Sequence, residues 1–571
     1  MSARAGEIAA WGPRVQRTRA IAADCARRLE ALPPLAVLGT AIVIEWLAVL
    51  GLALKVHHNG WIYYQGGDQL WYYSLGWLLG HGHLWQTPIG YLWSFILLPF
   101  ARIAGPDVAS ALPAIVLLNV LVLLPAAMLA LYGIAARLGG RLFGYWTLLV
   151  WIVVPFIGIL YTDTGYHQRY TEVILPQGLG LTAMADFPTM VATVVALYFC
   201  ARVVLDARPS LLDAAAGGLA FGAAIGLKPS VALVLLGPAL AFFARRQFAA
   251  LACFAVSLLP AVLTLAFWKA RGLGQVPLLS AEPAHVPAGV AAVLPVGGIN
   301  LNRYTHLLSW HELSKNIDLL REHFWSGHGA VWLVLAGLIA IGLRSRPAAL
   351  LIGGSFLPFT IVKSSYIASI EDTSLFRILI PAFPMFVLGL AALPYLLPGT
   401  RRRTPAYTPV VRVPSQRVRL GLLGAVVLLT AIAPIAATAA AKRSGGPPIA
   451  ILSNTQMPVP VDVDLGLRAQ KRGGRVLLTW REVHPAGGAV FYRVWRLPAR
   501  ADRGLACGTP RGAVYCTLTT NEVGLTRQGA RYDTPPRGTW VYRVGVAANW
   551  LDDPAQGDVY FASEPVVVRV P

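Results

Sequence analysis

Long apolar runs separated by short basic segments make up most of the chain as far as residue 440. A helix needs about 20 consecutive apolar residues to cross a bilayer, and the first run, 34–55, has that length. Applied along the chain, this criterion predicts about eleven membrane-spanning helices. The run at 212–243 counts as two short spans, because Lys228-Pro229 interrupts it with a costly charge and a helix-breaking ring. The remaining expected spans are 109–136, 142–161, 186–204, 248–268, 329–343, 348–362, 377–397 and 420–440.

Basic residues mark the expected cytoplasmic side of these helices, because Lys and Arg concentrate in cytoplasmic loops. Several arginines precede the first run, so residues 1–33 are expected to form a basic cytoplasmic segment and residues 34–443 the membrane domain. The long loops then lie outside, together with residues 444–571. These outer loops are expected at about 56–108, 162–185, 269–328 and 363–376.

Composition favours a membrane protein over a nucleic-acid-binding one. The chain is 56% hydrophobic and 13% charged, whereas soluble domains have about 25% charged residues. Its net charge of +21 comes from 48 basic and 27 acidic residues, but the basic residues occupy short loops. We therefore expect membrane lipid, and no nucleic acid, as a partner. Lys269, Arg271 and Lys442-Arg443 are exceptions that fall on the expected outer side. The Ala-, Arg- and Val-rich composition suggests a multi-pass protein of a bacterial plasma membrane.

The pattern changes after residue 458 to an alternation of period two, which predicts short antiparallel strands. Roughly a hundred residues of this kind are typical of an all-β sandwich. The order of Trp480, Tyr492 and Tyr542 resembles a fibronectin type III domain, in which Trp480 would pack the core and Tyr542 would be the corner tyrosine. We expect this domain to act as a spacer or lid, with glycan binding as the alternative.

The five cysteines divide between the two expected compartments. Cys25, Cys200 and Cys253 lie in or near the cytoplasmic side, where thiols stay reduced. Cys507 and Cys516 are the two cysteines of the exported tail, where disulfides persist. We expect these two to pair, and two free buried thiols are the alternative.

Acidic residues in or beside apolar runs are expensive and therefore informative. Asp68 follows a Gly-Gly turn and precedes an aromatic helical run, so its carboxylate either accepts the proton of an attacking hydroxyl or caps the helix. Asp186 opens the fourth span and allows the same two interpretations. Glu45 lies within the first span and needs a partner or a cavity. Asp163 ends the third span, either as a site residue or as a solvated loop charge.

The order of these features resembles the GT-C superfamily of membrane glycosyltransferases, which use polyprenyl-phosphate sugars. The layout is similar to the family 39 protein mannosyltransferases and the lipid A aminoarabinose transferases, over about 34–400. It includes an acidic residue, Asp68, early in the first outer loop. Asp186, at the start of the fourth span, corresponds to the family's second acidic position. Gly226–Ser230 (GLKPS) resembles a Gly-x-x-Lys break between two short spans, and Phe376–Pro384 (FRILIPAFP) resembles a segment that enters a late span. Many relatives carry two adjacent acids where this chain has Asp68-Gln69.

This resemblance implies a transferase that moves a sugar from a polyprenyl-phosphate donor to an extracytoplasmic glycan, lipid or protein acceptor, with inversion at the anomeric carbon. Asp68 is the implied general base, and Asp186, Glu45 and Asp163 are candidates for a second acidic site. A leaving phosphate needs cations nearby. The candidate cations, for each of which interfacial snorkelling is the alternative, are Lys228, Arg377, Arg303 and Arg321.

No cofactor is indicated by the sequence. The expected loop at 269–328 is rich in possible ligands, but their spacing is not that of a metal site, so we expect a wet amphipathic loop over the acceptor cleft. Walker and nucleophile-elbow motifs are absent. The possible ligands in this loop include His306, His311, Glu312, His323 and His328.

Three rival interpretations remain open. A lipid-linked glycan flippase or secondary transporter would show inverted repeats and breaks at the midplane. An O-antigen-ligase-like enzyme would rely on Arg and His in the segment 303–328. A degenerate transferase core would serve only to anchor the β-domain.

Overall fold

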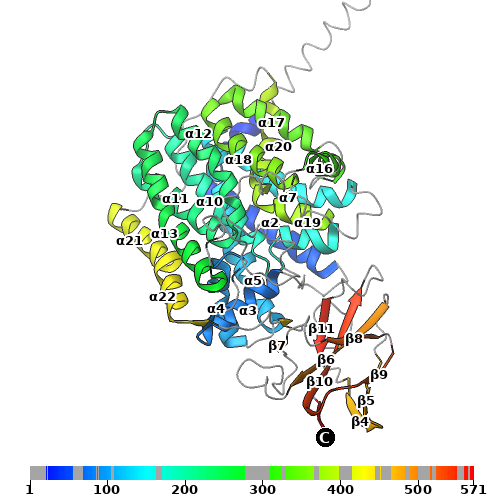
Figure 1. Ribbon diagram of the computed structural model, residues 1–571. Helices are drawn as coiled ribbons and strands as arrows, with labels where there is room; N and C mark the ends of the chain where they lie inside the picture. The colour runs from blue at the N-terminus through cyan, green and yellow to red at the C-terminus, as the bar shows by residue number, and fades with distance from the viewer. Residues whose placement is uncertain are drawn as a thin grey trace, which may run out of the picture.

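The computed structural model describes most of the helical region and part of the C-terminal region (Figure 1). The described residues are 21, 24–55, 68–84, 87, 89–104, 108–161, 170–274, 276, 309–323, 330–365, 372–397, 415–443, 450–451, 465–482, 489–498, 515–516, 522–526, 528–549, 558–562 and 566–571.

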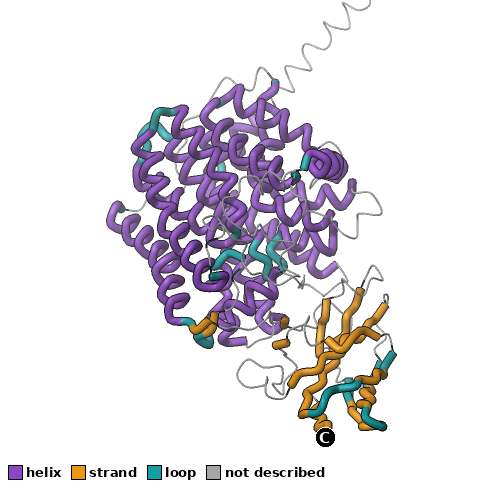
Figure 2. The backbone as a smooth tube through the Cα atoms, in the orientation of Figure 1, coloured by secondary structure: helices purple, strands orange, loops and turns teal. Residues whose placement is uncertain are grey.

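The expected membrane helices are present and form one bundle (Figure 2). Among the described residues, seven helices are long and apolar enough to cross a membrane, and every expected span falls on one of these or on a shorter apolar helix. The polytopic helical fold class is therefore confirmed. The seven are Pro34–Leu54, Ala111–Gly139, Asp186–Leu205, Phe248–Leu273, Arg346–Ser364, Leu375–Leu396 and Gln416–Ala440, and the shorter ones are Leu92–Ala104, Arg141–Ile157, Leu211–Leu227, Pro229–Ala244 and Trp332–Arg344.

Several of these spans combine an α-helix with a tighter or wider turn. The wider π-turn in the second span frees the Val120 carbonyl, which accepts a hydrogen bond of 2.8 Å from Trp46 Nε1. The helical elements are α2 (Pro34–Lys55), α3 (Asp68–Gly80), α4 (Leu92–Ala104), α5 (Val108–Leu118), η1 (Asn119–Leu123), α6 (Leu124–Gly139), α7 (Arg141–Tyr161), η2 (Tyr170–Ile174), α9 (Leu175–Gly178), α10 (Asp186–Leu205), α11 (Leu211–Leu227), η3 (Pro229–Leu235), α12 (Leu236–Ala244), α13 (Phe248–Leu273), α16 (Trp310–His323), α17 (Ala330–Arg344), α18 (Arg346–Ser364), α19 (Asp372–Leu379), η4 (Ile380–Ala382), α20 (Phe383–Ala392), η5 (Leu393–Leu396), α21 (Gln416–Val427), η7 (Leu428–Ile432) and α22 (Ala433–Ala440).

The apolar run at 212–243 is interrupted where the sequence predicts. Helix α11 ends at Leu227, Lys228 is extended with φ −143° and ψ 102°, and the 3₁₀ helix η3 begins at Pro229. Pro229 lacks an N–H group, and a residue before proline avoids the helical region. The break is therefore a local consequence of the Lys228-Pro229 pair.

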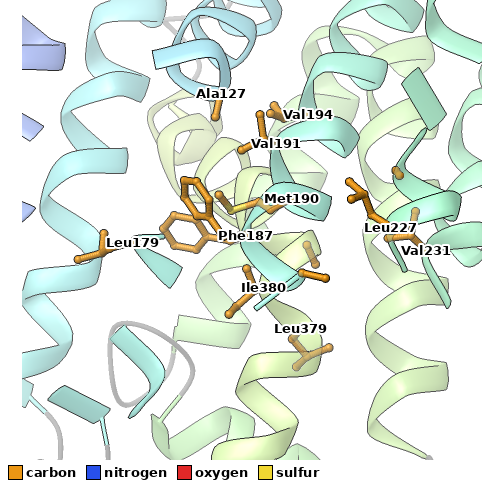
Figure 3. Packing of buried hydrophobic residues seen from close by; sticks show 14 of the residues in the cluster. Ala127, Leu179, Phe187, Met190, Val191, Val194, Leu227, Val231, Leu379 and Ile380 are labelled. Atoms are coloured by element: carbon orange, nitrogen blue, oxygen red, sulfur yellow. The ribbon is translucent and has the colours of Figure 1, made fainter. Parts of the chain in front are cut away.

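The centre of the bundle is apolar and tightly filled. Phe187 and Met190 of α10 are fully buried and point toward Leu179 and Ile380 (Figure 3). Helix α21 lies at the edge, and Leu429 of the adjoining η7 is 66% exposed, as expected of a surface that faces lipid.

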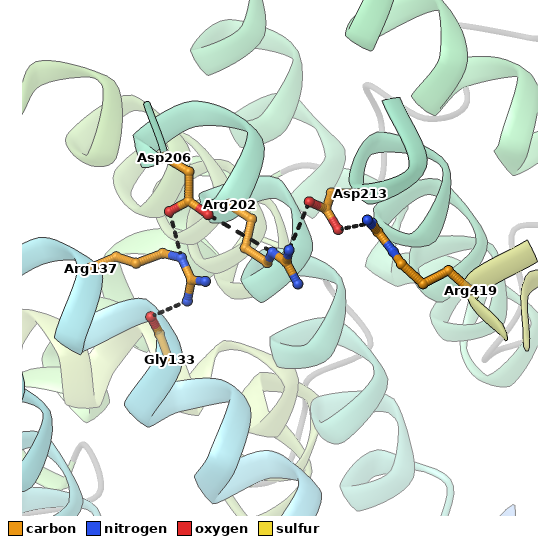
Figure 4. A network of polar contacts seen from close by, with 6 residues as sticks. All are labelled: Gly133, Arg137, Arg202, Asp206, Asp213 and Arg419. Atoms are coloured by element: carbon orange, nitrogen blue, oxygen red, sulfur yellow. Dashed lines mark hydrogen bonds and ion pairs between the residues drawn. The ribbon is translucent and has the colours of Figure 1, made fainter. Parts of the chain in front are cut away.

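Three arginines and two aspartates join helix ends at one end of the bundle (Figure 4). Arg137 of α6 pairs with Asp206 at 2.8 Å, and Asp213 of α11 pairs with Arg202 at 3.2 Å and with Arg419 of α21 at 2.5 Å. This network, which we call the Arg137–Arg419 network, lies at the end of α10 opposite Asp186. It ties the peripheral helix α21 to the bundle.

The described part of the C-terminal region contains two larger antiparallel sheets and a two-stranded one of β3 (Ala450–Ile451) and β7 (Tyr515–Cys516), which confirms the expected strands. Trp480 is buried against Tyr492, with ring centroids 5.4 Å apart. The fibronectin type III resemblance is not confirmed, and the Tyr542 hydroxyl donates to the Asp533 carboxylate at 2.5 Å, whereas a corner tyrosine bonds to the backbone. One larger sheet contains β4 (Arg468–Arg472), β5 (Arg475–Thr479) and β9 (Ala530–Asp533); the other contains β6 (Ala489–Pro498), β8 (Glu522–Thr526), β10 (Gly538–Asn549), β11 (Asp558–Ala562) and β12 (Val566–Val570).

The expected disulfide falls largely outside the described residues. Cys507 is among the residues outside them, and only the backbone of Cys516, in β7 (Tyr515–Cys516), is described. The pairing stays a prediction. Cys25, Cys200 and Cys253 are free thiols.

The basic residues that break the loop-charge rule have structural roles at the junction of the two regions. Lys442-Arg443 form β2, which pairs in parallel with β1 (His83–Leu84). Arg271 donates to the Ala441 carbonyl at 2.8 Å, and Lys269 Nζ donates to the Thr87 and Ile89 carbonyls at 2.6 and 3.0 Å. The side chains of Lys269 and Arg271 are therefore held by backbone carbonyls.

Candidate functional site

The break between α11 and η3 carries an ion pair between a part-buried lysine and a buried aspartate. The Lys228 ammonium bonds the Asp186 carboxylate, and the two side chains are 17% and 2% exposed. Asp186 is the first residue of α10, where a carboxylate is also stabilised by the positive end of the helix dipole. The pair therefore joins two of the sequence candidates in one place.

The segment that carries Asp68 packs directly on this break. Tyr72 of α3 donates its hydroxyl to the Leu227 carbonyl at 3.1 Å. A Cβ on Gly90 would lie 2.3 Å from the same carbonyl oxygen, and a Cβ on Gly226 would lie 2.9 Å from the Tyr91 ring. Only glycines permit these approaches, so the first long loop and the break fit together as one packed unit.

Three side chains hold the loop that leads into Asp186. Gln69 Oε1 accepts the Ala183 N–H at 3.1 Å, and Trp93 Nε1 donates to the Ala183 carbonyl at 2.7 Å. Asn119 Nδ2 donates to the Gly180 and Thr182 carbonyls, both at 3.0 Å. The backbone before Asp186 is thus fixed by α3, by α4 and by the π-turn η1.

A second lysine, Lys363 of α18, adjoins the ion pair and was missed by the sequence analysis. Helix α18 runs antiparallel to η3 and α12: Ser355 Oγ donates to the Val234 carbonyl at 2.9 Å, and Gly237 packs on Leu351. If this antiparallel pairing is extended toward the start of η3 and the end of α18, Lys363 lies at the same height along the helices as Lys228. The Lys363 ammonium interacts electrostatically with both Lys228 and Asp186. The sequence feature that could have indicated Lys363 is a lysine in the last turn of the apolar helix α18.

The other sequence candidates are placed only in part. Asp68 begins α3 and Arg321 lies in α16, but their side chains are outside the described residues, as are Asp163 and Arg303 entirely. Arg377 is half-buried in α19, three residues before Ile380.

Glu45 makes no hydrogen bond or ion pair with Lys228 or Asp186 among the described residues. It is fully buried halfway along α2, about 16 Å from the start of that helix at 1.5 Å per residue. Neither carboxylate oxygen has a hydrogen bond of good geometry within the described part of the chain, although the Trp151 side chain of α7 lies beside it. Its place in a second acidic site stays a prediction.

An apolar pocket lies one helical turn from Asp186. It is lined by Met190, Tyr170, Pro155, Ile380 and Phe383, among others. The Tyr170 hydroxyl donates to the Pro155 carbonyl at 2.6 Å, which leaves the pocket without a free polar group from this tyrosine. Ile380 belongs to the segment that also carries Arg377.

A metal centre is not evident in the described part of the chain. Within it, no three His, Cys, Asp or Glu side chains gather closely enough to hold an ion. The cations of the site are supplied by lysine.

Comparison with solved structures finds neighbours at low similarity. No family model and no curated protein matches the sequence. One structural neighbour is ArnT from Cupriavidus metallidurans bound to undecaprenyl phosphate, with TM-score 0.41, 14% identity, and coverage of 62% of this chain and 59% of that one. Another is the archaeal oligosaccharyltransferase AglB from Archaeoglobus fulgidus in complex with an inhibitory peptide and a dolichol-phosphate, with TM-score 0.39, 12% identity and coverage of 72% and 56%.

Both neighbours belong to the GT-C superfamily, the one that the sequence motifs resemble. The matched region spans less than two thirds of either neighbour.

Proposed function

We propose that this protein is a membrane glycosyltransferase that moves a sugar from a polyprenyl-phosphate donor to an acceptor outside the membrane. The observation that carries the proposal is the part-buried Lys228–Asp186 pair at a helix break. Helix α3, which begins at Asp68, packs on that break through Tyr72. The segment that carries the candidate base Asp68 and the break that carries the paired cation Lys228 are thus packed together.

In the proposed reaction, the Asp68 carboxylate takes the proton of an acceptor hydroxyl as that oxygen attacks the anomeric carbon. The bond from the anomeric carbon to the phosphate oxygen breaks, the configuration inverts, and polyprenyl phosphate leaves with the bonding pair. The departing phosphate gains negative charge, which nearby cations stabilise. No cofactor enters this balance.

Lys228 is the proposed phosphate ligand, and Asp186 is proposed to orient it. A lysine on a flexible stem in an apolar bundle needs a counter-charge to stay extended and ionised. Lys363, which interacts electrostatically with Lys228 and Asp186, is proposed as a second cation of the site. The apolar pocket at Met190 and Ile380 offers surface for the first units of the lipid chain.

The test is sugar transfer by purified protein in nanodiscs, offered a panel of polyprenyl-phospho-sugars and an envelope extract as acceptor. Wild type should release polyprenyl phosphate and form product, whereas folded Asp68→Asn should lose at least about 100-fold in rate, the usual contribution of a positioned base. Full activity of Asp68→Asn would move the base to Asp186 or Asp163. Thermal unfolding of both proteins controls for folding.

Glu45 favours one alternative, transport of a lipid-linked glycan. An ionisable side chain buried halfway through a bundle often lies on a transport or proton path. Flipping of a fluorescent lipid-linked glycan in proteoliposomes, lost in Glu45→Gln, together with no transfer of any sugar, would replace the transferase proposal.

A further inference from the structure

Two amide side chains hold the loop before Asp186, and they do so in opposite senses. Asn119 uses its NH₂ group, which donates to the Gly180 and Thr182 carbonyls. Gln69 uses its oxygen, which accepts the Ala183 N–H. The identity of each amide end follows from these partners, because a backbone N–H must face an oxygen and a carbonyl must face an NH₂.

The amide atom that is left without a hydrogen-bond partner therefore differs between the two residues. Asn119 is left with one unpaired oxygen, a common situation for a carbonyl-type acceptor. Gln69 is left with an NH₂ group that is buried and has no acceptor among the described residues. Buried donors without acceptors are rare, and each asks for an explanation such as a ligand. Asn119 is thus fully explained as a loop anchor, whereas Gln69 is not.

The position of Gln69 indicates the ligand. It directly follows Asp68, and three residues later Tyr72 holds the carbonyl of Leu227, the residue before Lys228. Through Ala183 it is also fixed to the loop that delivers Asp186. Its NH₂ group therefore belongs to the structural unit that carries both the candidate base and the paired lysine.

We propose that Gln69 binds an anionic phosphate oxygen of the lipid donor through Nε2. This rests on the proposed transferase function and adds a neutral hydrogen-bond donor to its lysines. A rigid amide donor in a buried place stabilises an oxyanion strongly, because it needs no reorganisation and no counter-ion. The Ala183 N–H supplies that rigidity by fixing the amide plane.

The test measures binding of undecaprenyl phosphate to full-length protein in nanodiscs, with undecaprenol and inorganic phosphate as separate arms. Gln69→Glu keeps an oxygen for the Ala183 N–H but removes the donors, and Gln69→Met removes both without adding charge. Asn119→Ala loosens the same loop and leaves the Gln69 donors in place, so it is the matched control for a merely structural effect. Thermal unfolding of each variant reports how much the loop has loosened.

We expect both Gln69 variants to weaken undecaprenyl phosphate binding by about 10-fold or more, the usual effect of losing a hydrogen bond to a charged group. Undecaprenol binding should not change, and Asn119→Ala should weaken phosphate-lipid binding less than Gln69→Met does. Inorganic phosphate that competes with the lipid would show that the headgroup alone suffices, which also supports the proposal.

Wild-type affinity in Gln69→Met, or an equal loss in Asn119→Ala and Gln69→Met, would overturn the role of Gln69 alone. If the wild type binds undecaprenol as well as undecaprenyl phosphate, no phosphate is recognised. In that case the transferase proposal fails together with this inference. Unchanged affinity in Gln69→Met, by contrast, rejects only the role of Gln69, so the two failures can be told apart.

Discussion

Lys228 and Asp186, 42 positions apart in the chain, form a part-buried ion pair at the one place where the run 212–243 leaves helical geometry. The lysine is presented by a break that Pro229 enforces, and the aspartate by the first turn of α10. The break, the loop before α10 and helix α3 are held together by hydrogen bonds from Tyr72, Gln69 and Trp93.

Replacing Lys228 by Met should remove transfer and destabilise the protein by about 3 kcal/mol, because an uncompensated carboxylate stays buried. The double variant Lys228→Met with Asp186→Asn leaves no unpaired buried charge, so it should regain most of that stability. It should still be inactive in sugar transfer. Thermal unfolding and transfer are measured on the same preparations. If the double variant were as unstable as the single one, the ion pair would not be the source of the loss.

Gly90→Ala should damage the contact between the first loop and the break. Its Cβ would lie 2.3 and 2.4 Å from the Leu227 and Gly226 carbonyl oxygens, so backbone must move. Overpacking of this kind costs about 1–3 kcal/mol. Gly51→Ala is the control: it lies in helix α2 with no atom within 4 Å of the added Cβ, so it should be neutral or stabilising. Equal unfolding midpoints for both variants would contradict the close approach.

Arg419→Met should loosen α21 by breaking the Arg137–Arg419 network. The guanidinium bonds Asp213 at 2.5 Å, and both side chains are mostly buried, at 19% and 4% exposed. Loss of a hydrogen bond to a charged group costs about 1.5–3 kcal/mol, reduced here because Arg202 still pairs with Asp213. Arg417→Met, on the exposed part of the same helix, should change the unfolding midpoint little. Protease cleavage near residue 415 gives a second readout.

The β-domain should lose stability at high pH through Tyr542. Burial, and then the hydrogen bond and charge of Asp533, raise the pKa of Tyr542. The unfolded chain gives up this proton near its ordinary pKa of about 10, while the folded domain keeps it, so stability present below that pH is lost as pH rises further. Tyr542→Phe should remove this part of the pH dependence and cost about 1 kcal/mol at neutral pH. An unchanged alkaline slope in Tyr542→Phe would assign the effect to other groups.

The break at Lys228 and the start of α10 at Asp186 could be predicted because they depend on local chemistry. A Lys-Pro pair inside an apolar run ends a helix in almost any surroundings, and an aspartate before an apolar run begins one. Glu45 had the same signal as Asp186, an acid within or beside a span, yet the two have different environments. The depth of a residue along its helix can be read from the chain, but which neighbour it faces cannot.

The chain by itself determined that apolar runs as far as residue 440 form helices, that the run 212–243 breaks at Lys228, and that strands follow in the C-terminal region, because each follows from short-range periodicity and turn chemistry. Only the tertiary structure decided that Lys228 pairs with Asp186 and that Lys363 interacts electrostatically with both. It also decided that Gln69 holds the loop that precedes Asp186. Those relationships depend on how helices distant in sequence rotate and pack against one another, which no local pattern encodes.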